Sequence, residues 1–165
     1  MTNAIPSDSA YCLHYDNGMF LTANYMAMEQ RFFLTWNALQ NRMLYTPGVL
    51  DGLAVAKRDD QTLSLESGGG FDRQGRFLLR TDGSPDLALP SGLVGPCFVH
   101  LAFPVKDQLT EQSQVKNLAA LAQISASVEP PDDGLLLAEI TVSAEGRIET
   151  VIDRRERARH RIAAG

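Results

Sequence analysis

Three histidines are the residues best suited to acid–base chemistry or metal binding, and they lie far apart in the sequence. His14, His100 and His160 form no HExxH or HxH pattern, and no cysteine–histidine cluster accompanies them. A histidine in an apolar strand, such as His100, is more often a hydrogen-bonded core residue than a metal ligand. No serine stands in a GxSxG nucleophile motif. We therefore expect neither a nucleophile nor a metal ligand among these residues.

A glycine run and two acidic pairs are the other patterns that could bind an anion or a metal. The glycine run, 68–70, lacks the lysine and the serine or threonine of a phosphate-binding loop, and it joins strand to strand. The acidic pairs at 59–60 and 132–133 do not supply oxygen ligands at alternate positions across about a dozen residues, as calcium loops do. We expect the glycine run to be a flexible hairpin tip and the acidic pairs to be turns. The sequence thus predicts no catalytic residue, no cofactor and no metal site.

One carboxylate has a more unusual place, because Glu29 falls within the apolar face of a predicted helix. Thr22 is a suitable N-cap for a helix from Ala23 to Leu44, and Pro47 with Gly48 ends it. An unpaired buried carboxylate is strongly destabilising. Glu29 is therefore expected to be buried and either to accept hydrogen bonds from loop amides or to pair with an arginine.

The apolar face of this helix is wider than a surface helix needs. Its apolar side chains spread over roughly 160°, whereas a stripe of about 100° is enough to face a core. Gln40 also interrupts this face, but it lies ~16 Å along the axis from Glu29, so the two cannot form a site alone. We expect a helix that is shared with another subunit or wrapped on two sides by its own chain. The expected interface residues on this face are Glu29, Tyr25, Phe32, Trp36 and Met43.

The chain divides into three predicted parts. Residues 1–10 are expected to be a flexible N-terminal arm and residues 11–153 a single domain. Residues 154–165 form a basic C-terminal tail, interpreted as a solvated helix end or a partner-docking tail. After the helix the apolar pattern alternates with a period of two, except in a nearly continuous apolar strand over 97–103 that is expected to be buried on both faces. The predicted fold class is α+β, with a long N-terminal helix packed on a mostly antiparallel sheet of about six strands.

Composition limits the partners and the compartment. The chain of 165 residues has a formal net charge of -5 and an isoelectric point near 5.1, which argues against nucleic-acid and anionic-membrane binding. Residues 1–10 lack the features of a signal peptide, and no apolar run of about 18 residues could span a membrane. Cys12 and Cys97 form no CxxC pair and are expected to be reduced, buried thiols. The chain is expected to fold in the cytoplasm.

Three segments carry motifs that belong together. The first, YDNGMFLTANYMAMEQRFFLTWNALQNRMLYTPGVLDGLAV, has an aromatic-x-x-G-x-x-L-T entry and a helix with a Glu-Gln-x-Tyr/Phe core. The second, LESGGGFDRQGR, is a glycine-rich hairpin with an Asp-x-x-Gly-Arg turn through Asp72 and Arg76. The third, LLLAEITVSAEGRIETVIDRR, ends in G-x-I-x-x-(V/I)-x-D-x-R through Asp153 and Arg155. In this order the segments resemble the contractile-tail and baseplate-associated protein family.

The resemblance implies a structural component of a phage tail or contractile injection particle, in the baseplate or where tail fibres attach, such as the collar. Such a protein acts through protein–protein assembly and is not an enzyme. Its implied partners are other tail or baseplate subunits, and its implied location is the virion tail after assembly in the host cytoplasm. The wide helix face adds the expectation of a homo-oligomer, a trimer or dimer.

Two alternatives belong to other classes of protein. One is a glycan- or receptor-binding module in which Trp36, Tyr11 or Tyr45 stacks on a sugar. The other is a small cytosolic enzyme whose site has no recognisable motif. A change in Trp36 fluorescence on adding sugars would favour the first alternative, and activity screening of the purified protein would be needed to reveal the second.

Overall fold

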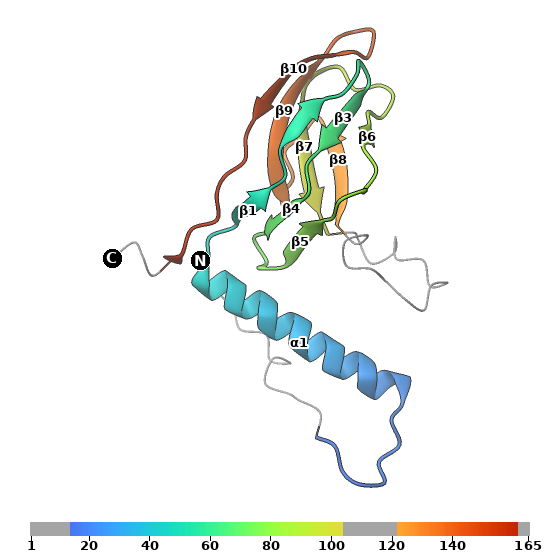
Figure 1. Cartoon of the computed structure of the whole chain (residues 1–165), viewed down its shortest axis with the longest axis vertical. Helices are drawn as coiled ribbons and strands as arrows, with labels where there is room; N and C mark the ends of the chain where they lie inside the picture. Colours follow the sequence, from blue (N-terminus) through green and yellow to red (C-terminus); the bar gives the residue numbers. More distant parts are fainter. Residues whose placement is uncertain (1–13, 104–121, 162–165) are drawn as a thin grey trace.

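The computed structural model describes residues 14–103 and 122–161, in which one helix precedes ten short strands (Figure 1). The helix, α1, spans Ala23–Leu44. Its N-cap is Thr22, whose Oγ1 accepts a hydrogen bond from the Tyr25 amide at 3.3 Å, and its C-cap is Tyr45. The helix bounds predicted from the sequence are therefore confirmed.

In the described residues the strands form three antiparallel sheets. The largest sheet has the spatial order β10 (Ile148–Asp153), β9 (Leu135–Val142), β7 (Gly95–Ala102) and β8 (Gln123–Ser127). The second has the order β1 (Gly48–Gly52), β4 (Gly68–Phe71) and β5 (Phe77–Arg80). The third has the order β2 (Val55–Lys57), β3 (Thr62–Leu65) and β6 (Leu87–Ala88). The predicted α+β class is confirmed, although the strands are more numerous and are divided among three sheets.

The sheets cover each other's apolar faces. One cluster joins Leu63 of β3 to Cys97 and Val99 of β7, together with buried residues of β8, β9 and β10. A second cluster joins residues of β1, β5, β7 and β9. Along β7 buried residues alternate with half-buried ones, so the expectation of a strand buried on both faces is wrong. A strand of a layered antiparallel structure turns one face to the core and the other outward.

α1 meets the sheets only near its C-terminal end. None of its residues is buried, and most of the helix projects away from the strands (Figure 1). Contact is made by the last turns, where Asn41 Nδ2 donates a hydrogen bond to the Gly75 carbonyl at 3.1 Å. The expected packing of a helix on a sheet is thus limited to these turns, because the sheets already bury their apolar faces against one another.

The glycine run is a strand and not a flexible hairpin tip. It forms most of β4, Gly68–Phe71, which lies between β1 and β5. A Cβ atom added to Gly70 would lie 2.4 Å from the Gly48 carbonyl oxygen and 2.7 Å from Cδ1 of Leu135. The absence of side chains therefore lets β4 approach β1 and the core more closely than other residues would allow.

The described part of the basic C-terminal segment, 154–161, lies along β1 and is not a separate tail. The Val49 amide donates to the Glu156 carbonyl at 2.7 Å, and the Val49 carbonyl accepts from the Ala158 amide at 3.0 Å. Arginine side chains of the segment also donate to carbonyls of residues 45–52. Residues 154–160 form no helix end, and their backbone pairs with a strand of the same chain. β1 is an edge strand, and the segment satisfies the backbone groups that this edge would otherwise leave unpaired.

Candidate assembly surface

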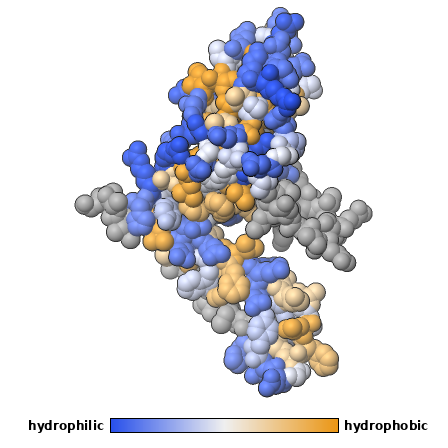
Figure 2. All heavy atoms as spheres, in the orientation of Figure 1, coloured by the Kyte–Doolittle hydropathy of each residue, from blue (hydrophilic) through white to orange (hydrophobic). Residues whose placement is uncertain are grey.

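α1 carries large apolar side chains at its surface, from its projecting part to its last turn. Tyr25 is 37% exposed, Trp36 49% and Met43 45%, and Figure 2 shows hydrophobic residues along this part of the molecule. Phe32 is half-buried, and its ring centroid lies 5.5 Å from that of Phe33 and 5.9 Å from that of Trp36. The apolar residues that the sequence assigned to an interface are therefore brought together on one accessible helix face.

Glu29, the charged residue of the same face, is half-buried and not buried as expected. Its carboxylate accepts a hydrogen bond from the hydroxyl of Tyr15, which lies in the segment before the helix. This hydrogen bond is the main reason why the pKa of Tyr15 is raised. Desolvation and the charge of Glu29 raise the same pKa further. The carboxylate is accessible because no sheet covers this part of the helix, so a tyrosine hydroxyl takes the place of the predicted loop amides or arginine.

A groove lies where the last turns of α1 meet the turn between β4 and β5. It encloses about 610 Å³. A Cβ atom on Gly75 would lie 2.0 Å from the Ala38 carbonyl oxygen, so the turn and the helix are in direct backbone contact. The apolar residues that line the groove are Leu34, Ala38, Leu39, Phe77, Leu79 and Phe103. Sequence analysis missed this groove because its two walls come from separate parts of the chain.

Asp72 and Arg76 are brought together and hold the turn beside this groove. The Asp72 side chain is almost fully buried, and its Oδ1 accepts hydrogen bonds from the amides of Gln74 and Arg76, each at 2.9 Å. Arg76 Nε lies 2.6 Å from Asp72 Oδ2. The guanidinium of Arg76 lies 5.0 Å from the centroid of the Phe103 ring, close enough for a cation–π interaction. This pair therefore shapes one wall of the groove.

Asp153 and Arg155 form a second pair on the opposite side of β1 from β4. Arg155 Nη2 lies 2.6 Å from Asp153 Oδ2, and Arg155 Nη1 donates to the Gly52 carbonyl at 2.7 Å. The hydrogen bonds from the Arg155 side chain and amide lower the pKa of Asp153 to about 2, and the same pairing raises the pKa of Arg155. The pair fixes the start of the C-terminal segment to β1, a structural role.

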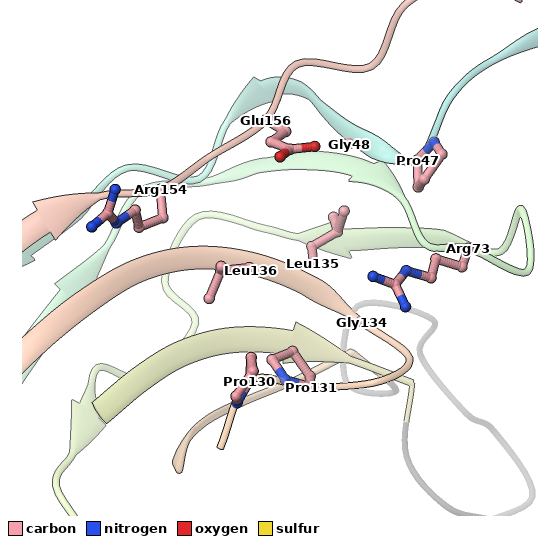
Figure 3. A pocket seen from close by; sticks show the side chains of 10 residues that line it. All are labelled: Pro47, Gly48, Arg73, Pro130, Pro131, Gly134, Leu135, Leu136, Arg154 and Glu156. Carbon is pink, nitrogen blue, oxygen red and sulfur yellow. The ribbon is translucent and has the colours of Figure 1, made fainter. Parts of the chain in front are cut away.

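A smaller pocket lies between β1, β9 and the β4–β5 turn. It encloses about 180 Å³, and Figure 3 shows Arg73 and Arg154 at its opposite ends with Glu156 between them. Arg73 donates to the Asp132 carbonyl at 3.1 Å. Arg154 Nη2 lies 2.7 Å from a carboxylate oxygen of Glu139. Both arginines therefore hold neighbouring loops and strands together, which is a structural use of their charge.

The residues that could take part in catalysis or metal binding occupy structural positions. His100 Nε2 lies 2.9 Å from Ser125 Oγ across the β7–β8 pair. Burial lowers the pKa of His100, which favours the neutral imidazole near pH 7. Burial also raises the pKa of the Cys97 thiol, as expected for an unreactive core cysteine. Over 14–103 and 122–161, no three histidine, cysteine or acidic side chains group closely enough to hold a metal ion.

Of the tyrosines considered as sugar platforms, Tyr45 has its ring in contact with two other rings of the same chain. Its ring stacks on Phe71 with centroids 5.4 Å apart and meets His160 edge-on at 5.3 Å. Tyr11, like Cys12, lies outside the residues that the structure describes. Within the described part of the chain there is also no helix of the length and hydrophobicity that a membrane span requires.

The fold has a counterpart among solved structures. The structure titled "Crystal structure of TssK" superposes with a TM-score of 0.58 and 12% sequence identity, over 85% of this chain and 40% of that one. At this identity the likeness shows a shared fold, and this chain spans less than half the length of that protein. No protein-family model and no curated protein sequence matches the chain.

Proposed function

We propose that this chain is a structural subunit of the baseplate of a contractile injection particle, such as a phage tail. The observation that carries the proposal is the fold shared with TssK, a baseplate component of type VI secretion that is related to phage baseplate proteins. The motifs of three segments resemble the same group of proteins independently of that superposition. The proposed role is assembly with neighbouring baseplate subunits, and it is not enzymatic.

The arrangement of α1 supports this role. A helix with large apolar side chains at its surface and no buried residue offers a docking surface to other chains. The groove beside its last turns adds an apolar concavity with a charged pair, Asp72 and Arg76, at its wall. A position in the particle tail, reached by assembly in the host cytoplasm, and association with further copies of the same chain belong to this proposal.

Electron microscopy of native particles labelled with an antibody against this chain tests the proposal. Label confined to one end of the contracted or extended tail is the expected result, with an antibody against a sheath subunit as the control for labelling along the tail. Purified particles that contain other baseplate subunits but not this chain, by mass spectrometry, would show that the proposal is wrong.

A further inference from the structure

Two charged side chains are buried in the part of the chain that the structure describes, and they are compensated differently. Asp72 pairs with Arg76. Arg80, the last residue of β5, is 7% exposed. Over 14–103 and 122–161, no carboxylate lies within ion-pair distance of its guanidinium. Because a buried charge is costly unless hydrogen bonds or an opposite charge compensate it, other groups must stabilise Arg80.

Main-chain carbonyls bind most of the Arg80 guanidinium. Its Nε donates a hydrogen bond to the Leu65 carbonyl at 3.1 Å. Its Nη2 donates to the carbonyls of Ser84 at 3.1 Å and Pro85 at 2.8 Å. These bonds use every N–H group of Nε and Nη2, whereas Nη1 makes no hydrogen bond within the described residues and is not closed off from solvent. The carbonyls therefore hold the guanidinium in one position and leave its Nη1 donors available.

A pocket of about 620 Å³ lies beside this guanidinium, and it is called the Arg80 pocket below. One wall is Arg80 with the loop 81–86 that joins β5 to β6, and the other is the start of β8 with Gln123 and Ile124 (Figure 1). Because the rest of Arg80 is buried against its own chain, its accessible nitrogen faces this pocket. The pocket thus presents donors from an arginine that is already fixed in place.

The charges around the pocket leave Arg80 without an anion of its own. Burial is the main cause that lowers the pKa of Arg80, and the negative charge of Asp86 opposes this effect. Asp86, however, forms an ion pair with Arg58, so one carboxylate is shared by two arginines. Asp82 also borders the pocket, but it is exposed, and solvent and salt screen its charge more than that of a buried group.

We propose that the Arg80 pocket binds an oxyanion, the phosphate or carboxylate group of a ligand, which accepts hydrogen bonds from Arg80 Nη1. Hydrogen bonds between an arginine and an oxyanion are charge-assisted, and they are stronger where the surrounding protein excludes water. The fixed guanidinium loses little conformational freedom when the ligand binds. This inference is independent of the proposed function and concerns a different part of the molecule from α1.

Titration of the full chain with inorganic phosphate at constant ionic strength, followed by NMR, tests the site. Saturable shifts are expected for the Arg80 side chain and for the amides of 81–87 and 122–124. Arg80→Gln weakens binding at least about tenfold, the loss expected for a hydrogen bond to a charged group. Arg73→Gln is the matched control, because Arg73 also lines a pocket and donates to a carbonyl, yet it lies elsewhere. Equal weakening in both variants, or shifts that never saturate, overturns the proposal.

A second position keeps the test valid if Arg80→Gln does not fold. Gln123 is exposed on the edge strand β8 and borders the pocket. Gln123→Glu weakens phosphate binding about threefold and Gln123→Lys strengthens it about threefold, because the added charge faces the ligand. Gln30→Glu, at an exposed position of α1, changes the net charge equally and leaves the affinity unchanged. Equal affinities of the two Gln123 variants, or an effect of Gln30→Glu as large as that of Gln123→Glu, overturns the proposal.

Acetate, titrated in the same way, distinguishes the two sources of an oxyanion. Tighter binding of phosphate assigns the pocket to a phosphate-bearing ligand. Tighter binding of acetate assigns it to a carboxylate, such as the acidic side chain of a partner protein. If neither anion gives saturable shifts around Arg80, the pocket is not an oxyanion site and Arg80 serves only to hold the loop 81–86 on β3.

Discussion

The β1 edge and α1 differ in how far other segments of the same chain cover them. β1 lies between β4, where glycines allow contact without side chains, and the C-terminal segment, which pairs with its backbone. α1 has satisfied caps but buries none of its side chains. The comparison shows a chain that covers the free edge of β1 with its own C-terminal segment and leaves most of α1 accessible. Substitutions should therefore affect stability strongly at β1 and β4 and weakly on α1.

The largest effect is expected at the contact between β4 and β1. Gly70→Ala should lower the free energy of unfolding by at least about 2 kcal/mol, because the new Cβ would overlap Gly48 and Leu135 and the strands must separate. Denaturant unfolding measures the change. Gly92→Ala is the control, since a Cβ there meets nothing within 4 Å and only the left-handed backbone, φ +90°, resists it, by about 1 kcal/mol. Equal losses in the two variants would mean that close packing is not what β4 requires.

A somewhat smaller effect is expected at the β4–β5 turn. Asp72→Ala leaves the Gln74 and Arg76 amides without their acceptor and should lower the free energy of unfolding by about 2 kcal/mol. Asp72→Asn should cost less, since its amide oxygen still accepts from both amides, while the amide nitrogen that replaces Oδ2 no longer accepts from Arg76 Nε. Thermal unfolding of both variants gives the comparison. An Asn variant as unstable as the Ala variant would show that the ion pair, and not the turn amides, stabilises this region.

The Asp153–Arg155 pair should have a weaker and pH-dependent effect. The pKa of Asp153 in the folded chain is lowered from 3.8 to about 2, so the pair's contribution is present above about pH 4 and is lost as the pH falls toward 2. Because the Asp153 side chain is 59% exposed, solvent screening keeps this contribution below about 1 kcal/mol. The difference in unfolding free energy between wild type and Asp153→Asn, measured at pH 7 and near pH 2, should shrink at the lower pH. A difference that stays constant with pH would contradict this account.

The smallest effect is expected on α1. Tyr15→Phe removes the hydrogen bond to Glu29, yet both groups are accessible to water, which replaces the lost bond. We expect no measurable change in the melting temperature at a fixed protein concentration. Differential scanning calorimetry of the variant and the wild type checks this. A fall of several degrees would indicate that Glu29 is anchored as firmly as the β1 edge.

Local sequence signals determined the elements whose ends depend on neighbouring residues. Thr22 caps α1 through a group three residues away, and the β9–β10 hairpin turns at Gly146, whose φ is +75° and whose amide donates to the Ser143 carbonyl at 2.9 Å. These interactions involve residues close in sequence, so residue types and spacing predict them. The same is true of the wide apolar face of α1.

Contacts between distant segments were decided only by the tertiary structure. The glycine run reads as a flexible turn by composition, yet it becomes β4 because β1 and the core leave no room for side chains there. Leu53 adopts a φ of +61° and is fully buried, a conformation that leucine avoids unless surrounding packing imposes it. The arginines after β10 have polar side chains suited to solvent, and their pairing with β1 follows from the edge that this strand presents. Which face of α1 stays accessible was likewise undetermined by the sequence, because periodicity defines a face but not what covers it.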